Sequence, residues 1–311
     1  MGRANVSTMS IPTLSLSPYG PLVSRLALGM WRLADAGLTS SQTLALVEGC
    51  LDIGVTTIDH ADVYGDYLCE ERFGVALAAK PSLRDDLQLI TKCGIKLVSP
   101  NRPAHRIKHY DTSRAHIVAS VENSLTRLRT ERIDVLLIHR PDPLMDVDEV
   151  AQAFIDLKRA GKVLYFGVSN FSNGQFDLLA SRLPFPVVTN QVEFSVLRTD
   201  PLTDGTFDQC QRLRIAPMAW SPLGGGRLLH GKDQRTNGLR AALTQVGAEL
   251  GGQTPERLAL AWVMAHPARV VPVIGTSKLE RVRDAAAAAD VSLTREQWFI
   301  ILKAATGADV P

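Results

Sequence analysis

Short apolar runs rich in β-forming residues alternate with amphipathic stretches along almost the whole chain, and this alternation limits the possible folds most strongly. Eight runs have the length of buried strands: 26–30, 57–60, 87–92, 135–139, 164–168, 187–192, 216–220 and 270–274. Eight stretches have a helical period: 41–53, 69–79, 113–129, 147–160, 173–182, 206–213, 254–265 and 279–288. Several of these begin near Ser, Thr or Asp, which are good helix N-caps. Eight strand–helix units predict an α/β protein, a closed parallel (β/α)8 TIM barrel.

The alternative α/β architecture is an open, doubly wound sheet, which usually has a Gly-rich nucleotide fingerprint after its first strand. Here that position reads Leu-Gly-Met-Trp-Arg and lacks a G-x-G-x-x-G motif, which favours the barrel. Residues 11–22 predict an N-terminal hairpin or plug, and residues 294–306 predict an extra C-terminal helix. We see no linker rich in Pro, Gly or Ser, so we expect one domain over residues 11–311 and disorder over residues 1–10.

The charge and cysteine content exclude several classes of partner. Lys and Arg number 34 against 32 Asp and Glu, which gives a formal charge of +2 and no broad electrostatic field. We therefore expect neither nucleic acid nor a membrane surface as a partner. The four cysteines form no C-x-x-C pair and no signal peptide precedes them, so reduced thiols and a cytoplasmic location are expected. The sequence does not indicate an oligomeric state.

Polar residues end three neighbouring predicted strands. Active sites of such barrels lie at the C-terminal ends of the strands. The second predicted strand ends in Asp59 and His60, the third in Lys92 and the fourth in His139, while Tyr64 follows the second strand. Each residue alone has a structural reading, as an ion pair, a satisfied polar group or a packed ring. Their convergence on one rim favours a catalytic reading.

These side chains have complementary roles in proton transfer. An unperturbed tyrosine has a pKa near 10, and a nearby ammonium lowers it by favouring the phenolate. Lys92 can supply that ammonium, and Asp59 can keep Lys92 protonated and oriented. His139 can donate to the substrate oxygen. The set predicts that Tyr64 gives a proton to a developing alkoxide, as carbonyl reduction requires.

A metal-dependent barrel hydrolase is a different reading of the same rim. It would use Asp59, His60, Asp62 and His139 as ligands around an open metal. The first predicted strand has no H-x-H motif, which counts against this reading. We expect no metal.

Six blocks of the sequence form a series, at residues 54–65, 137–142, 167–171, 190–194, 220–224 and 272–277. Together they resemble the aldo-keto reductase family and, within it, the bacterial oxidoreductases of the YdhF type. Gly-Val-Thr-Thr-Ile-Asp-His-Ala-Asp-Val-Tyr-Gly (54–65) is similar to the family signature, with His60 where Thr is commoner. Leu-Ile-His-Arg-Pro-Asp, Gly-Val-Ser-Asn-Phe, Asn-Gln-Val-Glu-Phe, Trp-Ser-Pro-Leu-Gly and Pro-Val-Ile-Gly-Thr-Ser follow in family order. Together the blocks cover about residues 13–290.

The resemblance implies reduction of an aldehyde or ketone by hydride transfer from C4 of a nicotinamide, with Tyr64 as general acid. The family tetrad falls on Asp59, Tyr64, Lys92 and His139. Ser169, Asn170 and Gln191 match residues that bond the carboxamide, and Trp220 matches the aromatic that stacks on the nicotinamide. Further cofactor residues implied by the resemblance are Met30, Trp31, Asp59, Ser221, Pro222, Leu223, Gly224, Gly225, Gly226, Arg227, Gly275, Thr276, Ser277, Lys278, Arg281 and Asp284.

The basic residues Lys278 and Arg281 near hydroxyl donors suit a 2′-phosphate, which favours NADP(H) over NAD. Ala285 departs from the Asn that many members have near the adenine. The implied substrate pocket, for a small carbonyl compound, comprises Trp31, His60, Tyr64, His139 and Phe171.

Two further expectations concern regulation and access. Potassium-channel β subunits also resemble this family, so a regulatory or redox-sensing NADP(H)-binding subunit is the alternative to an enzyme. The loop over residues 99–112 is expected to overhang the site. Its basic residues and histidines would attract an acidic substrate or remain solvated: Arg102, His105, Arg106, Lys108 and His109.

Overall fold

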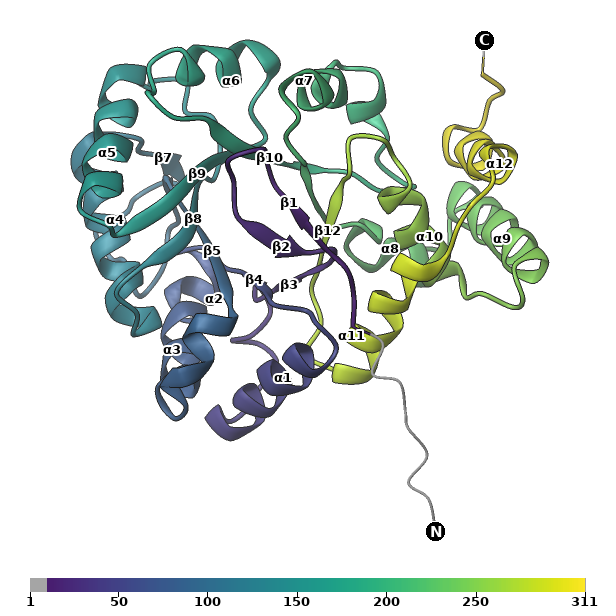
Figure 1. The fold of residues 1–311 in the computed structure, drawn as a ribbon, viewed down its shortest axis with the longest axis horizontal. Coiled ribbons are helices and arrows are strands. Elements are labelled where there is room, and N and C mark those ends of the chain that lie inside the picture. The colour runs from purple at the N-terminus through teal and green to yellow at the C-terminus, as the bar shows by residue number, and fades with distance from the viewer. Residues whose placement is uncertain (1–9, 311) are drawn as a thin grey trace.

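The computed structural model describes residues 10–310 and has a closed barrel of eight parallel strands inside a ring of helices (Figure 1). The predicted TIM barrel is thereby confirmed. Strand β12 pairs with β3, which closes the barrel. The strands are β3 (Ala27–Gly29), β4 (Thr57–Asp59), β5 (Gln88–Cys93), β8 (Ile133–Ile138), β9 (Val163–Ser169), β10 (Val187–Glu193), β11 (Met218–Trp220) and β12 (Val271–Ile274). Except for Ser10, the residues 1–10 expected to be disordered lie outside the described part.

Eight helices agree with the predicted ones to within a few residues. They are α1 (Ser40–Asp52), α3 (Cys69–Ala78), α4 (Arg114–Leu128), α5 (Val147–Arg159), α6 (Asn173–Ala180), α7 (Thr206–Leu213), α10 (Pro255–Met264) and α11 (Leu279–Ala286). Thr39 and Ser172 form capping boxes at α1 and α6, and Asp146 caps α5. Such caps satisfy N–H groups that have no partner inside the helix, which explains why the helices begin there.

The N-terminal hairpin closes the N-terminal end of the barrel. Strand β1 (Thr13–Ser15) pairs antiparallel with β2 (Leu22–Ser24), so the hairpin ends two residues later than predicted. It crosses the middle of the barrel in Figure 1. Leu16 and Val23 are fully buried in one cluster with barrel residues such as Ile90 and Val135. The hairpin therefore plugs the barrel with apolar side chains.

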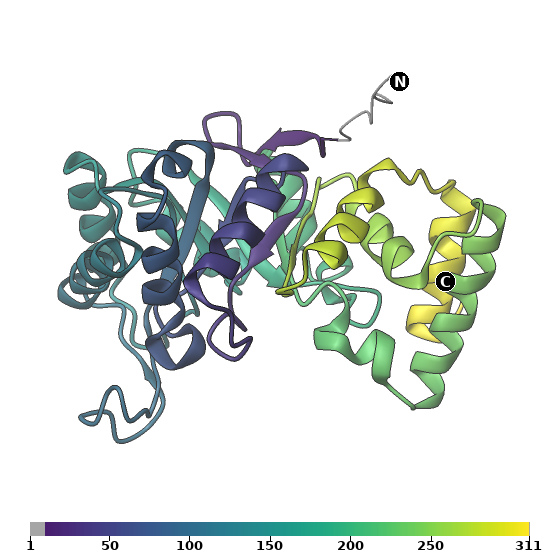
Figure 2. The same ribbon diagram turned by 90° about the horizontal axis from the view of Figure 1, so that it is seen from below.

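The main missed elements lie in the two excursions outside the regular repeat. The long helix α9 (Gln234–Glu249) was not predicted, and it packs against the predicted C-terminal helix α12 (Arg295–Thr306) at one edge of the molecule (Figure 2). The short helix α8 (Arg227–His230) precedes it. The predicted 99–112 loop lies largely between two short paired strands, β6 (Ile95–Lys96) and β7 (His109–Tyr110). It projects beyond the barrel at the end opposite the hairpin.

Two tryptophans fasten α12 to α10. The rings of Trp262 and Trp298 stack with centroids 4.8 Å apart and planes 9° from parallel. Trp262 Nε1 donates to the carbonyl of Trp298 at 3.0 Å, and Trp298 Nε1 donates to the carbonyl of Trp262 at 3.1 Å. Both indole donors therefore have partners, as buried polar groups require.

No helix within residues 10–310 is both long and apolar enough to cross a membrane.

Candidate active site

Lys92 lies at the centre of a buried polar cluster at the C-terminal end of the barrel. Its Nζ donates to Asp59 Oδ2 at 2.6 Å and also contacts Asp59 Oδ1. The same atom is 2.8 Å from the carbonyl oxygen of His60 and 3.0 Å from the hydroxyl of Tyr64. The side chains of Lys92 and Asp59 are almost completely buried. The phenol is therefore directly bonded to a buried ion pair.

Strand alternation explains why these groups meet. Successive side chains of a strand point to opposite faces, so Ile90 and Lys92 share the inner face of β5. Ile90 belongs to the apolar cluster inside the barrel. Thr91 faces outward, where its hydroxyl donates to Glu70 of α3 at 2.6 Å. Parallel register then aligns the inward residues at the ends of β4, β5 and β8.

Tyr64 reaches the cluster because the chain turns sharply after β4. It begins the short element α2 (Tyr64–Tyr67), in which Gly65 has φ +55° and Asp66 and Tyr67 are also left-handed. A Cβ on Gly65 would lie 2.4 Å from Ala34 Cβ and 2.5 Å from Cys69 Sγ. Any other residue at this position would force Ala34 or Cys69 to shift and would strain the left-handed backbone. The Tyr64 ring packs edge-to-face against His139, with centroids 5.8 Å apart.

The pKa values agree with only part of the predicted electrostatics. Burial disfavours the Lys92 ammonium, but Asp59 and Tyr64 together raise the pKa of Lys92 above its ordinary value, so it stays charged as predicted. Burial also raises the pKa of Tyr64, and the opposing effect of Lys92 does not reverse this. The expectation that Lys92 brings the Tyr64 pKa down toward neutrality is therefore wrong for this structure, because desolvation outweighs the ammonium. Tyr64 is protonated at neutral pH.

His139 is a neutral imidazole. Burial is the largest cause that lowers its pKa well below the ordinary value, followed by the charges of Lys92, Arg140 and Lys108. Its Nδ1 is buried and makes no hydrogen bond to any described residue. A neutral imidazole still has one N–H to donate. Lys108 comes from the projecting 99–112 segment, so the charge of that segment reaches the site.

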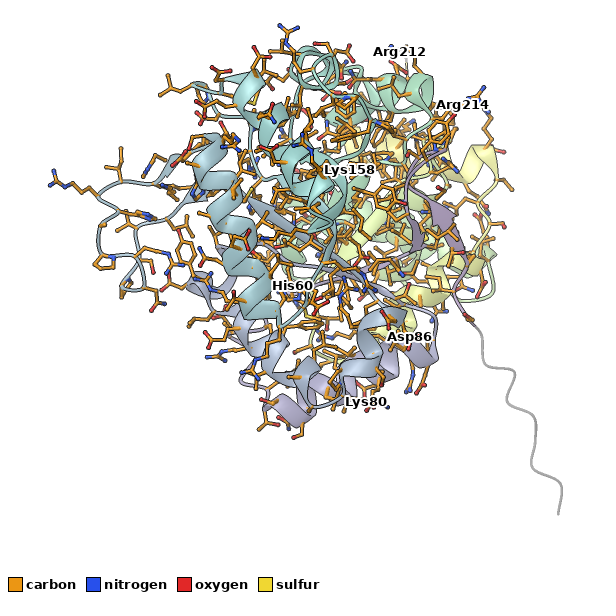
Figure 3. The ribbon with its side chains drawn as sticks, turned by 60° about the vertical axis from the view of Figure 1, so that its left-hand side comes forward. His60, Lys80, Asp86, Lys158, Arg212 and Arg214 are labelled. Atoms are coloured by element: carbon orange, nitrogen blue, oxygen red, sulfur yellow. The ribbon has the colours of Figure 1, made fainter. Side chains whose placement is uncertain are left out.

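The side chains of two predicted pocket residues, His60 and Phe171, are buried. His60 follows the inward-facing Asp59 and is completely buried; Figure 3 labels its position. There it packs edge-to-face against Phe73 of α3, with centroids 4.7 Å apart, and burial lowers its pKa to about 3. Phe171 is also buried, in the apolar cluster that packs the helices onto the barrel. Of these two residues only His60 contacts the tetrad, through its carbonyl oxygen on Lys92, and the assignment of both side chains to the substrate pocket stays a prediction.

The residues predicted to hold the carboxamide form one hydrogen-bonded chain with the tetrad. Ser169 ends β9, and its hydroxyl donates to the carbonyl of Gln191 on β10 at 2.7 Å. Asn170 Nδ2 donates to Ser169 Oγ at 2.7 Å. Gln191 Nε2 donates to Asp59 Oδ2 at 3.1 Å. Trp220 Nε1 completes the chain by donating to Asn170 Oδ1 at 2.9 Å.

The predicted pyrophosphate segment forms an open cradle of backbone. Gly224, Gly225 and Gly226 all have positive φ, at +61°, +64° and +99°. No heavy atom lies within 4 Å of a Cβ built on Gly225. Ser221 also has a positive φ. Pro222 is buried and Leu223 is half-buried, so both pack against the rest of the protein. Arg227 is exposed and 3.9 Å from Asp233.

The adenosine end lies where β12 leads into α11. Gly275 is open, and Thr276 Oγ1 accepts from the Lys278 backbone N–H at 3.2 Å, close to Ser277. Within residues 10–310, neither Lys278 nor Arg281 has a carboxylate partner, and both are exposed. Asp284 forms an ion pair with Arg257 of α10, a partner that sequence reasoning missed. Ala285 is buried in the apolar cluster beneath α11.

The segment that follows strand β3 contributes one buried and one exposed residue to this end of the barrel. The Met30 side chain is buried, and its backbone N–H donates to the carbonyl of Asp59 at 2.8 Å. Trp31 is 56% exposed. Arg140, which the sequence reading did not select, places its guanidinium 5.4 Å from the Trp220 ring centroid. Its position directly after His139 was the signal that could have found it.

The four side chains of the metal-hydrolase reading do not converge. Asp59 is paired with Lys92, His60 faces α3, and Asp62 accepts from Ser120 of α4 at 2.7 Å. In the part of the chain that the structure describes, no group of three or more His, Cys, Asp or Glu is placed to hold a metal ion.

Comparison with known proteins agrees with this geometry. The model of the aldo/keto reductase family matches residues 25–305. The chain is 50% identical to oxidoreductase YdhF of Escherichia coli (strain K12), over 97% of this chain and 100% of that protein. It is 46% identical to a 6-dehydroglucose reductase of Agrobacterium fabrum, over 93% of this chain and 96% of that protein.

The fold is also similar to that of a solved aldo-keto reductase structure. The thermostable aldo-keto reductase Tm1743, in complex with the inhibitor epalrestat, is similar with a TM-score of 0.79 and 26% identity. The match covers 94% of this chain and all of the other. With the family match over most of its length, this chain belongs to the aldo/keto reductase family of oxidoreductases.

Proposed function

We propose that this protein uses NADPH to reduce an aldehyde or ketone to an alcohol, with Tyr64 as the proton donor. One observation carries the proposal: the Tyr64 hydroxyl is 3.0 Å from Lys92 Nζ, which is itself paired with Asp59. A phenol bonded to a buried ammonium can release its proton to a nearby oxygen, because the phenolate left behind is stabilised.

The residues present fit a nicotinamide dinucleotide. The Gly224–Gly226 cradle leaves room for a pyrophosphate, since a Cβ is missing where the backbone must be approached closely. Ser169, Asn170 and Gln191 would hold the carboxamide, and Trp220 would support the ring. The unpaired Lys278 and Arg281 favour a 2′-phosphate and therefore NADP(H). When bound, the nicotinamide supplies the hydride.

The protein's own residues handle the proton. Tyr64 carries its proton at neutral pH, because an ordinary tyrosine pKa is already near 10 and burial raises the pKa of Tyr64 further. As charge develops on the carbonyl oxygen, the phenol passes its proton to that oxygen, and Lys92 stabilises the resulting phenolate. His139, neutral and packed against the Tyr64 ring, donates a hydrogen bond to the same oxygen and orients it. The buried free cysteines fit a cytoplasmic reaction.

A polyhydroxylated aldehyde is the substrate class that we propose to test first. Two relatives, 46% and 39% identical to this chain, are named 6-dehydroglucose reductases. Trp31 is an exposed aromatic surface, and Arg140 offers guanidinium donors next to Trp220. Aromatic faces and fixed donors together suit a sugar-like compound, which has apolar ring faces and many hydroxyls.

The test is reduction of 6-dehydroglucose, simple aldehydes, ketones and quinones, followed by loss of NADPH absorbance. In Tyr64→Phe we expect kcat to fall by about 10²–10⁴-fold while NADPH binding is retained, because only the acid is removed. Tyr67→Phe is the control, since the Tyr67 hydroxyl accepts from the backbone N–H of Leu97 rather than from Lys92. Undiminished turnover in Tyr64→Phe would refute the acid assignment. Negligible turnover by the natural chain would favour a regulatory NADP(H)-binding subunit.

A further inference from the structure

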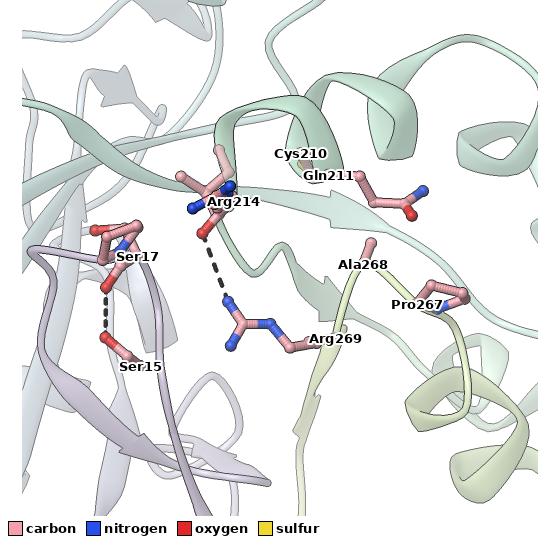
Figure 4. Close-up of a pocket in the computed structure, with 10 residues that line it drawn as sticks. Ser15, Ser17, Cys210, Gln211, Arg214, Pro267, Ala268 and Arg269 are labelled. Carbon is pink, nitrogen blue, oxygen red and sulfur yellow. Dashed lines mark hydrogen bonds between the residues drawn. The ribbon is translucent and has the colours of Figure 1, made fainter.

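Figure 4 shows a cavity of about 440 Å³. Its residues Arg214 and Arg269 precede β11 and β12, whereas Tyr64 follows β4, so the cavity lies at the opposite end of the barrel from Tyr64. It is formed by the turn between β1 and β2, the end of α7, and the segment that leads into β12. Ser15, Ser17 and Gln211 contribute polar groups, and Arg214 and Arg269 contribute charge. None of these residues belongs to the reductase site, so the cavity needs its own explanation.

The charge around this cavity is positive and unbalanced. Arg214 and Arg269 are neighbours, with Arg269 Nη2 3.5 Å from the carbonyl oxygen of Arg214 (Figure 4). No Asp or Glu lines the cavity, and residues 1–9, outside the described part, contain none. Among the described residues, neither arginine forms an ion pair. Two exposed arginines that line one cavity attract an anion.

A third arginine, Arg25, lies close enough to Arg269 for their positive charges to add. Arg25 donates to the backbone carbonyls of Met264 and Val270, at 2.7 Å for the first, and it has no carboxylate partner among residues 10–310. Burial lowers the pKa of Arg25 to about 10, and the charge of Arg269 contributes to this lowering. That repulsion shows that the two guanidinium groups interact. A bound anion would relieve it.

The cavity is larger than an inorganic anion requires. Its volume lies in the range of small-molecule sites, and Pro18, Ile215 and Pro267 give it an apolar wall. Paired guanidinium groups match the oxygens of a phosphate, which they bind through charge-assisted hydrogen bonds. We infer that this is a binding site for an organic phosphate monoester, with the phosphate on Arg214 and Arg269 and the organic group against the apolar wall.

This site is independent of the proposed reductase function. The cofactor residue Trp220 is the last residue of β11 and Lys278 follows the C-terminal end of β12, whereas Arg214 and Arg269 precede the same two strands. NADPH and the phosphate ester can therefore bind together. The inference of a phosphate ester site therefore does not depend on whether Tyr64 is a proton donor.

Calorimetric titration of the full chain tests the inference, with saturating NADPH to fill the cofactor site and constant ionic strength. The probes are phenyl phosphate, which has no carbonyl to reduce, and inorganic phosphate. We expect phenyl phosphate to bind at concentrations on the order of 1 mM or below, and inorganic phosphate to bind several-fold more weakly. In Arg214→Gln with Arg269→Gln, the affinity for phenyl phosphate is expected to fall at least about tenfold.

Arg129→Gln is the matched control. Arg129, like Arg214, is a left-handed residue at a helix C-cap, with φ +53° against +56°, but it does not line this cavity. Its substitution is expected to leave binding unchanged. The inference is overturned if neither probe binds, or if the double variant binds phenyl phosphate as well as the natural chain does. Equal affinities of the two probes would overturn the assignment of an ester.

Discussion

Asp62 has a carboxyl group buried behind the tetrad, and replacing it with asparagine tests the electrostatic reasoning most directly. Its Oδ2 accepts from Ser120 at 2.7 Å, while Oδ1 is buried without a hydrogen-bond partner among the described residues. Burial is the main cause that raises the pKa of Asp62 to about 7, and the charge of Glu70 adds to it. Ser120 and Arg127 oppose this rise without cancelling it.

The sign and size of the effect follow from the two pKa values. A raised pKa means that the folded state binds the proton more tightly than the unfolded state, where the value is near 3.8. Below about pH 4, Asp62 therefore does not lower the free energy of unfolding. As the pH rises, the loss in free energy of unfolding grows, and it is complete above about pH 7. The gap between the two values corresponds to about 4 kcal/mol.

Asp62→Asn removes the titrating group and keeps nearly the same shape. We expect the variant to gain up to about 4 kcal/mol in free energy of unfolding, relative to the natural chain, between about pH 4 and about pH 8. Urea denaturation across that range measures this difference. The control is Asp66→Asn, an exposed residue in the same segment. If the difference in free energy of unfolding between Asp62→Asn and the natural chain is the same at every pH, burial does not keep the carboxyl neutral and the reasoning fails.

Three further predictions concern the cofactor site and the helix packing. The double variant Lys278→Ala, Arg281→Ala is expected to lower the affinity for NADPH by more than about tenfold and the affinity for NADH much less, as measured by fluorescence titration. Equal losses of affinity for the two nucleotides would contradict the 2′-phosphate role. Adding NADPH is expected to quench or shift tryptophan fluorescence, and Trp220→Phe to reduce that change, whereas an undiminished change would count against stacking on Trp220. Gly74→Ala is expected to destabilise the fold by about 2 kcal/mol or more in urea denaturation, because the new Cβ would lie 1.9 Å from the carbonyl oxygen of Arg127. Gly174→Ala is its control, since no atom lies within 4 Å of that Cβ, and an equally large loss there would refute the steric explanation.

The barrel and the meeting of the tetrad could be predicted because both depend on local periodicity. A strand that ends in a polar residue brings that residue to the rim, and parallel strands bring their C-terminal ends to one rim. The side of the strand that each of two consecutive side chains faces was harder to predict. Asp59 and His60 are consecutive, so alternation alone requires one to face away from the barrel interior, whereas the sequence analysis assigned Asp59 to the tetrad and His60 to the substrate pocket.

Features that depend on tertiary burial could not be read from the sequence. The pKa of Tyr64 rises because the surrounding chain removes water from the phenol, and no motif encodes that balance. The partner of Asp284 is Arg257, which lies on another helix. Helix α9 was missed because its apolar residues form only a weak stripe and Gly238 and Gly247 interrupt it, so its helical state depends on packing against α12.

The reciprocal pair of Trp262 and Trp298 has a spectroscopic consequence. Two nearly parallel indoles 4.8 Å apart are close enough for their electronic transitions to couple. The near-ultraviolet circular dichroism of the protein therefore contains a signal that belongs to this pair and depends on α12 remaining docked on α10. Trp220 is not part of this pair, since its indole donates to Asn170, so the docking of the C-terminal helix and the occupancy of the cofactor site have different tryptophan signals in one unlabelled sample.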